Sequence, residues 1–243
     1  MSLPICLWSG PRNISTAMMR SFGARADTVC WDEPFFAAFL DQSGLAHPGR
    51  EETLEHCEKD AARVAERILE PVPADYHFQK HMAHHMLEGI PRDWMSKARH
   101  VLLLRHPARV IASYAKGRPD FTAEDLGFSA LRSLFDQLQD QQGRSPFVID
   151  SDDILSNPKS ALTAICEDGF GIAFDPAMLG WDAGPRAEDG PWAPYWYDNV
   201  IASTGFGSAP KNMPTVRAEH QAIYDNCLED YQALTALAWA AKD

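Results

Sequence analysis

The sequence predicts an α/β fold of three layers, in which helices cover both faces of a mostly parallel central sheet. Short apolar runs of strand length alternate with longer stretches in which apolar residues recur every three or four positions. The run from His100 to Leu104 is continuously apolar after its first residue, as expected of a parallel strand covered on both faces. This alternation indicates βαβ units. Ligands of such sheets bind at the carboxyl ends of the strands.

The individual elements follow from the same patterns. Strands are predicted at 4–8, 27–31, 76–80, 100–104 and 146–149. Helical stretches are predicted at 51–70 and 122–142, and further helices begin near 15, 107 and 158. We expect a single domain over 1–243, with a core over about 1–175, a loop or lid over 176–214, and a C-terminal helix over 215–243.

Bulk composition restricts the function classes. The 243 residues carry a formal net charge of −12, which argues against nucleic-acid and anionic-membrane partners. The five cysteines form no CxxC or zinc pattern, so we expect reduced thiols and no metal. There is no apolar stretch of membrane-spanning length and no basic start of a signal peptide, so cytoplasm is the expected location. A homo-oligomer is compatible with this composition.

The first predicted strand leads into the loop Ser9-Gly10-Pro11-Arg12-Asn13-Ile14-Ser15-Thr16 and then into a helix. Free backbone N–H groups and the helix dipole make such a helix start an anion site. Arg12 adds a cation that can bind two oxygens, and Ser15 and Thr16 add hydroxyls. The alternative is that Ser15 is only a helix cap. The P-loop lysine of GxxxxGK[ST] is missing, which argues against ordinary ATP or GTP hydrolysis.

Other chemically active side chains come at the ends of further strands. Glu33, Lys80 and Arg105 follow the second, third and fourth predicted strands, just as Arg12 follows the first. Because the carboxyl ends of parallel strands meet at one edge of the sheet, these four side chains are expected to converge on one site.

Three separated pieces of the sequence carry a family resemblance, and two of them are binding motifs. Pro11-Arg12-Asn13-Ile14-Ser15-Thr16 resembles the 5′-phosphosulfate loop of the sulfotransferase family, whose donor is PAPS (3′-phosphoadenosine 5′-phosphosulfate). Arg105, with Pro107 two residues on and Ser113 eight residues on, is similar to the 3′-phosphate motif of that family. The resemblance therefore implies a P-loop NTPase-like, sulfotransferase-like fold and PAPS as co-substrate. It implies cofactor binding by the loop residues Arg12, Asn13, Ile14, Ser15 and Thr16, and by Arg105 and Ser113.

The resemblance has limits. The segment Val148–Pro158 is similar to a later strand of the family and is interpreted as structural, and beyond about Phe174 the similarity thins. Ile14 stands where the family usually has glycine. The C-terminal Arg-Lys-Gly that also touches the 3′-phosphate in the family is absent, and the candidate substitutes are Lys211, or Ser203 and Thr204.

Sulfuryl transfer needs a base for the acceptor proton and a cation for the leaving phosphate. By the resemblance, Arg12 and Lys80 stabilise the leaving group. Glu33 is the favoured base, ahead of His85 and His81. The alternatives are that Glu33 caps the helix near Pro34 and that the histidines are packed, on the surface or bound to a metal. No Asp, Glu or Cys accompanies the histidines at ligand spacing.

The sequence therefore predicts a PAPS-dependent sulfotransferase that acts on a hydroxyl or amine of a small-molecule acceptor. One alternative is a nucleotide-dependent kinase on a variant P-loop, and another is a non-catalytic nucleotide-binding protein of the same fold. The aromatic residues Trp192, Tyr195, Trp196 and Tyr197 either stack on adenine or an acceptor ring, or form a small core under a long loop.

Overall fold

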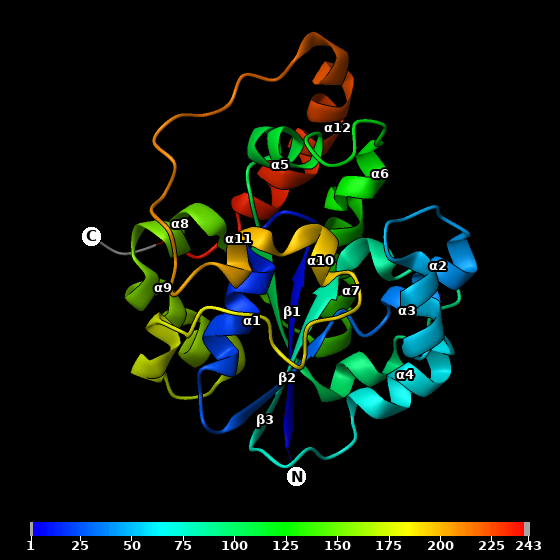
Figure 1. Ribbon diagram of the computed structural model, residues 1–243. Coiled ribbons are helices and arrows are strands. Elements are labelled where there is room, and N and C mark those ends of the chain that lie inside the picture. Colours follow the sequence, from blue (N-terminus) through cyan, green and yellow to red (C-terminus); the bar gives the residue numbers. More distant parts are fainter. Residues whose placement is uncertain (1, 241–243) are drawn as a thin grey trace.

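The computed structural model describes residues 2–240, and a five-stranded parallel sheet lies at its centre (Figure 1). The strand order is β2-β3-β1-β4-β5, and every neighbouring pair is parallel. The predicted fold class is confirmed. The strands are β1 (Leu3–Ser9), β2 (Thr28–Asp32), β3 (Tyr76–Met82), β4 (Arg99–Leu104) and β5 (Phe147–Asp150).

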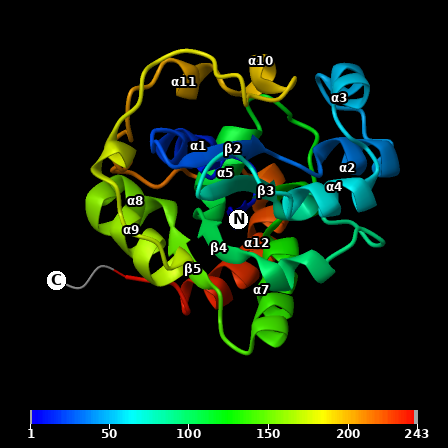
Figure 2. The same cartoon turned by 90° about the horizontal axis from the view of Figure 1, so that it is seen from below.

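Helices cover both faces of the sheet (Figure 2). On one face α1 (Ser15–Gly23), α8 (Ser151–Ser156) and α9 (Pro158–Ala164) bury a cluster that includes Leu7 of β1. On the other face α4 (Ala61–Ile68), α7 (Phe128–Gln142) and α12 (Gln221–Thr235) pack against a cluster that includes Trp8. Leu7 and Trp8 face opposite ways because successive side chains of a strand alternate between the two faces. The strands are thus apolar on both sides, as their sequences indicate.

Two predicted helices are each divided in the structure. The stretch 122–142 forms α6 (Ala123–Leu126) and α7, separated by Gly127 with a φ of 73°. Glycine adopts this left-handed conformation without steric cost, so the backbone turns there instead of continuing the helix. The stretch 51–70 forms α3 (Arg50–His56) and α4, and Asp60 caps α4 by accepting a hydrogen bond from the backbone N–H of Ala62.

The remaining helices lie along the rest of the chain. They are α2 (Phe36–Ser43), α5 (Pro107–Tyr114), α10 (Ala193–Trp196) and α11 (Asp198–Ile201). The last two lie in the region expected to be a loop or lid, and they cross above the carboxyl end of β1 (Figure 1).

The C-terminal helix begins later and ends earlier than the predicted range 215–243. The helix α12 spans Gln221–Thr235, and the N–H of Trp239 donates to the carbonyl of Val148 in β5, a contact that brings the chain back to the sheet. Residues 241–243 of that prediction lie outside the described residues. All five cysteines are free thiols, and three of them are buried. Among the helices of the described part of the chain, none has the length and hydropathy of a membrane span.

Candidate active site

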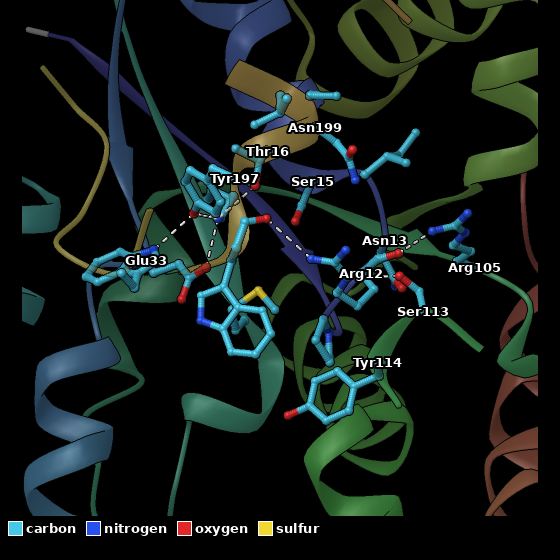
Figure 3. Close-up of a pocket in the computed structure, with 18 of the residues that line it drawn as sticks. Arg12, Asn13, Ser15, Thr16, Glu33, Arg105, Ser113, Tyr114, Tyr197 and Asn199 are labelled. Carbon is cyan, nitrogen blue, oxygen red and sulfur yellow. Dashed lines mark hydrogen bonds and ion pairs between the residues drawn. The ribbon is translucent and has the colours of Figure 1, made fainter. Parts of the chain in front are cut away.

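A cavity of about 420 Å³ opens at the carboxyl ends of the strands. Arg12, Glu33, Lys80 and Arg105 all line it, although they come from four different strands or strand ends. Figure 3 labels Arg12, Glu33 and Arg105 at this cavity. Lys80 belongs to β3 itself, because that strand continues to Met82. The four side chains therefore converge on one cavity, as the sequence predicts. A stretch of 192–207, from outside the core that the motifs cover, also lines the cavity.

The loop after β1 has an unusual backbone. Arg12 and Ile14 have φ values of 61° and 57°, in the left-handed region that favours glycine. Ile14, which stands where the sulfotransferase family usually has glycine, thus adopts a backbone conformation that favours glycine. It precedes α1 without a side-chain cap, and Ser15 is the first helical residue, so the interpretation of Ser15 as only a cap is wrong. Asn13 is buried and donates to the carbonyl of Leu103 at 3.2 Å, which ties the loop to β4.

Arg12 and Arg105 lie close together at this loop (Figure 3). Nη1 of Arg105 donates to the carbonyl oxygen of Arg12 at 2.6 Å, and Nε of Arg12 donates to Oγ of Ser113 at 3.0 Å. Within residues 2–240 neither guanidinium has a carboxylate partner. Arg105 is therefore not a strand-end salt bridge. Burial lowers the pKa of both arginines from its ordinary value, as expected of buried cations without a counterion.

A second group of charges lies around Lys80. Its Nζ is 2.7 Å from Oδ1 of Asp32 and 2.8 Å from Oε1 of Glu33, and it donates to Oγ1 of Thr16 at 3.3 Å. Lys80 therefore links Glu33 to the loop Ser9–Thr16, which we call the anion loop after the role that the sequence predicts for it. Glu33 has a φ of 41°, and the helix α2 begins after it without a side-chain cap, so Glu33 does not serve as a helix cap.

The protonation of this group follows from its burial and its charges. Burial raises the pKa of Glu33 and the charge of Lys80 opposes this, yet the net shift is upward, helped by Asp32. Burial acts to lower the pKa of Lys80, but the charges of Asp32 and Glu33 outweigh it, so the lysine stays protonated. A carboxylate with a raised pKa beside a permanent cation is a suitable general base.

Asp32 and Tyr197 belong to this group, and sequence reasoning assigned neither of them this place. The hydroxyl of Tyr197 donates to Oδ2 of Asp32 at 2.7 Å, and it accepts from Nζ of Lys80 at 2.5 Å and from Nε1 of Trp192 at 3.0 Å. We call Asp32, Glu33, Lys80 and Tyr197 the lysine cluster. Asp32 could have been found from its place next to Glu33 at a strand end. Tyr197 could not be found in this way, because its partner Asp32 is 165 residues away in the sequence.

The structure separates the three histidines that follow Lys80. His81 points into the core: its ring stacks on Trp8 at 4.3 Å and on Trp94 at 5.6 Å, and Nε2 bonds to Gln79. It is not among the described residues that line the cavity, so the assignment of His81 as a catalytic candidate is wrong. His84 and His85 do line the cavity. Burial lowers the pKa of both imidazoles, to about 4 for His84.

The sequence offers Lys211, Ser203 and Thr204 as substitutes for the absent Arg-Lys-Gly, and only one of them lines the cavity. Ser203 lines the cavity, but its Oγ already donates to the carbonyl of Val200 at 2.7 Å and accepts from Trp181. Lys211 is exposed, and neither it nor Thr204 is among the described lining residues. Gly205, Phe206 and Gly207 line this side of the cavity.

Comparison with known proteins identifies the family. The family model described as "Sulfotransferase domain" matches residues 3–238, so the chain belongs to the sulfotransferase domain family. Two solved structures share the fold over nearly the whole chain. The sulfotransferase domain from the curacin biosynthetic pathway has a TM-score of 0.52 and 14% identity, and covers 93% of this chain and 97% of its own. A sulfotransferase from Alicyclobacillus acidocaldarius has a TM-score of 0.53 and 12% identity, and covers 97% and 96%.

Two curated relatives come from Arabidopsis thaliana. Branched-chain-amino-acid aminotransferase-like protein 2 is 38% identical and branched-chain-amino-acid aminotransferase-like protein 1 is 37% identical, each over 228 residues. The alignments cover 93% of this chain but only 40% of each relative. The chain thus spans less than half the length of these relatives.

Proposed function

We propose that this chain transfers a sulfuryl group from PAPS to a hydroxyl or amine of a small-molecule acceptor, with Glu33 as the base. The observation that carries the proposal is the pair of guanidinium groups, Arg12 and Arg105, which lack carboxylate partners among residues 2–240 and line one cavity. They follow the ends of β1 and β4, two paired neighbouring strands of the sheet. A nucleotide with phosphates at both its 3′ and 5′ positions matches such a pair.

The residues present fit that donor. Nε of Arg105 is buried without a hydrogen-bond partner, and burial depresses the pKa of this guanidinium, so an anion there would satisfy both its charge and its donor. The start of α1 adds backbone N–H groups and a positive dipole end. When bound, PAPS would supply the activated sulfuryl group.

The chain's own residues would then accept the proton of the acceptor and stabilise the charge on the leaving phosphate. Glu33 would accept the acceptor proton at a carboxylate oxygen, because its raised pKa makes it a stronger base than an ordinary carboxylate. Lys80 lies within 3.3 Å of Thr16 in the loop and 2.8 Å of Glu33, so it would hold the base and face the charge that develops on the leaving phosphate. Arg12 would neutralise that charge from the other side of the loop.

Thermal shift tests the donor class. Adenosine 3′,5′-bisphosphate should raise the melting temperature, because a ligand that binds only the native state stabilises it by mass action. Arg105→Met should weaken that response at least tenfold in apparent affinity. Arg132→Met, which removes an arginine that is not among the described residues lining the cavity, should leave it unchanged.

The outcomes separate the alternatives. Stabilisation by Mg-ATP instead of the bisphosphate would favour the kinase and overturn the proposal. If the bisphosphate binds, Glu33→Gln should abolish transfer from PAPS while leaving bisphosphate affinity within about threefold. Binding without any transfer by the wild-type chain across hydroxyl and amine acceptors would favour the non-catalytic alternative.

A further inference from the structure

One side of the cavity is built from aromatic rings. These side chains all line the cavity, and we call them the aromatic wall: Phe36, Phe39, His47, His84, His85, Trp192 and Trp196. They come from three separate parts of the chain. Phe36 and Phe39 lie on α2, the histidines lie on the segments after α2 and β3, and the tryptophans lie at and within α10.

The rings of the aromatic wall contact one another in a continuous series. His85 stacks on Phe36 and Phe39 with centroid distances of 4.8 and 4.7 Å, and Phe36 meets Trp192 edge-on at 4.9 Å. His47 connects Phe36, at 5.1 Å, to Trp196, at 5.5 Å. These distances are those of favourable aromatic pairs, so the wall is a packed surface and not a collection of loose loop residues.

The aromatic wall adjoins the proposed base. Phe36 follows Glu33 by three residues, and its backbone N–H donates to the carbonyl of Glu33 at 2.9 Å. Trp192 donates to the hydroxyl of Tyr197, which contacts Lys80. The anion loop reaches the lysine cluster through Thr16. Glu33 and Lys80 therefore lie between the anion-binding part of the cavity and the aromatic wall.

The charges around the wall do not favour an ionic acceptor. Burial lowers the pKa of His47, His84 and His85, so the three imidazoles are neutral at pH 7. The other charged side chains that line this part of the cavity are Arg118 and Asp125, which have opposite signs. In the lysine cluster, one lysine faces two carboxylates, so an anionic acceptor gains no free cation there. A cationic acceptor would face Arg12, whose guanidinium has no carboxylate partner among residues 2–240.

We infer that the aromatic wall is the acceptor subsite and that its acceptor is an uncharged aromatic compound with a hydroxyl on or next to the ring. The inference rests on the proposed function. In the reaction, the acceptor oxygen forms a bond to sulfur while the bond from sulfur to the phosphate oxygen of PAPS breaks. The nucleotide phosphate leaves with that electron pair, and the hydroxyl proton goes to Glu33. A ring held against the wall puts its hydroxyl beside this carboxylate.

Calorimetry on the full chain saturated with adenosine 3′,5′-bisphosphate tests the acceptor class without needing turnover. The probes are naphthol, its saturated analogue decalol, and the anion hydroxynaphthoate, which share one carbon skeleton. We expect naphthol to bind about tenfold tighter than decalol, because ring–ring contacts add to the burial of the shared skeleton. Hydroxynaphthoate should bind more weakly than naphthol.

Variants assign the difference to the aromatic wall. Phe39→Leu and Trp196→Leu should each reduce the preference for naphthol over decalol severalfold, and both should leave bisphosphate affinity within about twofold. Tyr195→Leu is the matched control: it removes an aromatic ring from the same helix, but this side chain is 49% exposed and is not among the described lining residues. It should not change the preference.

Failure of this inference is distinguishable from failure of the proposed function. If the bisphosphate does not bind, the proposed function falls and the acceptor inference falls with it. If the bisphosphate binds but decalol or hydroxynaphthoate binds as well as naphthol, the acceptor inference is overturned while the proposed function stands. A preference for naphthol that survives both wall variants would overturn the assignment to this surface.

Discussion

Replacing Tyr197 by phenylalanine removes one oxygen from the centre of the lysine cluster and keeps the ring. That oxygen donates to Asp32 at 2.7 Å and accepts from Lys80 and Trp192. Burial, and next the charge of Asp32, raises the pKa of Tyr197 well above its ordinary value, so the hydroxyl keeps the proton that it donates. In the variant, Asp32 loses a donor in a buried place and Lys80 loses one of its acceptors.

The expected size of the effect follows from these contacts. Hydrogen bonds to charged groups contribute about 1.5–3 kcal/mol. The cluster is buried, with Lys80 and Asp32 1% and 3% exposed, so water cannot readily replace the lost partner. We therefore expect the free energy of unfolding to fall by about 2 kcal/mol. If the same interaction orients Lys80 and Glu33, kcat should fall up to about 30-fold, since 1.4 kcal/mol is a factor of ten.

Steady-state kinetics with PAPS, paired with calorimetry of adenosine 3′,5′-bisphosphate, separates positioning from general damage. We expect a lower kcat with bisphosphate affinity within about threefold of wild type, measured well below the melting temperature of the variant. Tyr195→Phe removes a hydroxyl from the preceding helix α10, at a residue that is 49% exposed, and serves as control. If Tyr197→Phe behaves like this control in kcat, the hydroxyl does not position the lysine cluster and the reasoning is refuted.

Three further predictions rest on single features. Ile14→Gly should leave the protein about 1 kcal/mol more stable than Ile14→Ala in urea unfolding, because only glycine adopts a φ of 57° without strain; equal stabilities would contradict this. Burial lowers the pKa values of His77, His84 and His100 to about 4, so the unfolded chain binds more protons as the pH falls below 6.5. Stability should drop by roughly 2 kcal/mol for each of them between pH 7 and 5, and a flat profile would count against neutral burial. Activity should be lost as the pH falls through the raised pKa of Glu33, with the acid limb of kcat above 4.5; a limb at or below that value would oppose its role as base.

The sheet and the convergence of four side chains could be predicted because both depend on local patterns. A run such as Val101 to Leu104 can be apolar throughout only if both of its faces are covered, and its parallel neighbours then end at the same edge. The positions of Arg12, Glu33, Lys80 and Arg105 follow from that rule alone. The break at Gly127 could not be predicted in the same way, because the apolar pattern of the helix continues on both sides of this glycine.

The parts that could not be predicted depend on contacts between distant segments. His81 and His85 are four residues apart and look equivalent in sequence, yet one faces Trp8 in the core and the other faces the cavity. The alternation along β3 explains this only in part, because His85 lies beyond the end of the strand in a short turn. Its direction is set by packing between Phe36 and Phe39, which no local pattern encodes.

The segment that carries Tyr197 is joined to the core by polar contacts at successive points. Arg20 pairs with Asp189 at 2.7 Å, with both side chains almost fully buried. Tyr197 reaches Asp32, and Arg12 donates to the carbonyl of Trp196 at 3.4 Å. Glu33, the loop after β1 and the aromatic wall are thus parts of one connected arrangement, to which the segment 189–197 contributes Trp192 and Trp196 of the wall.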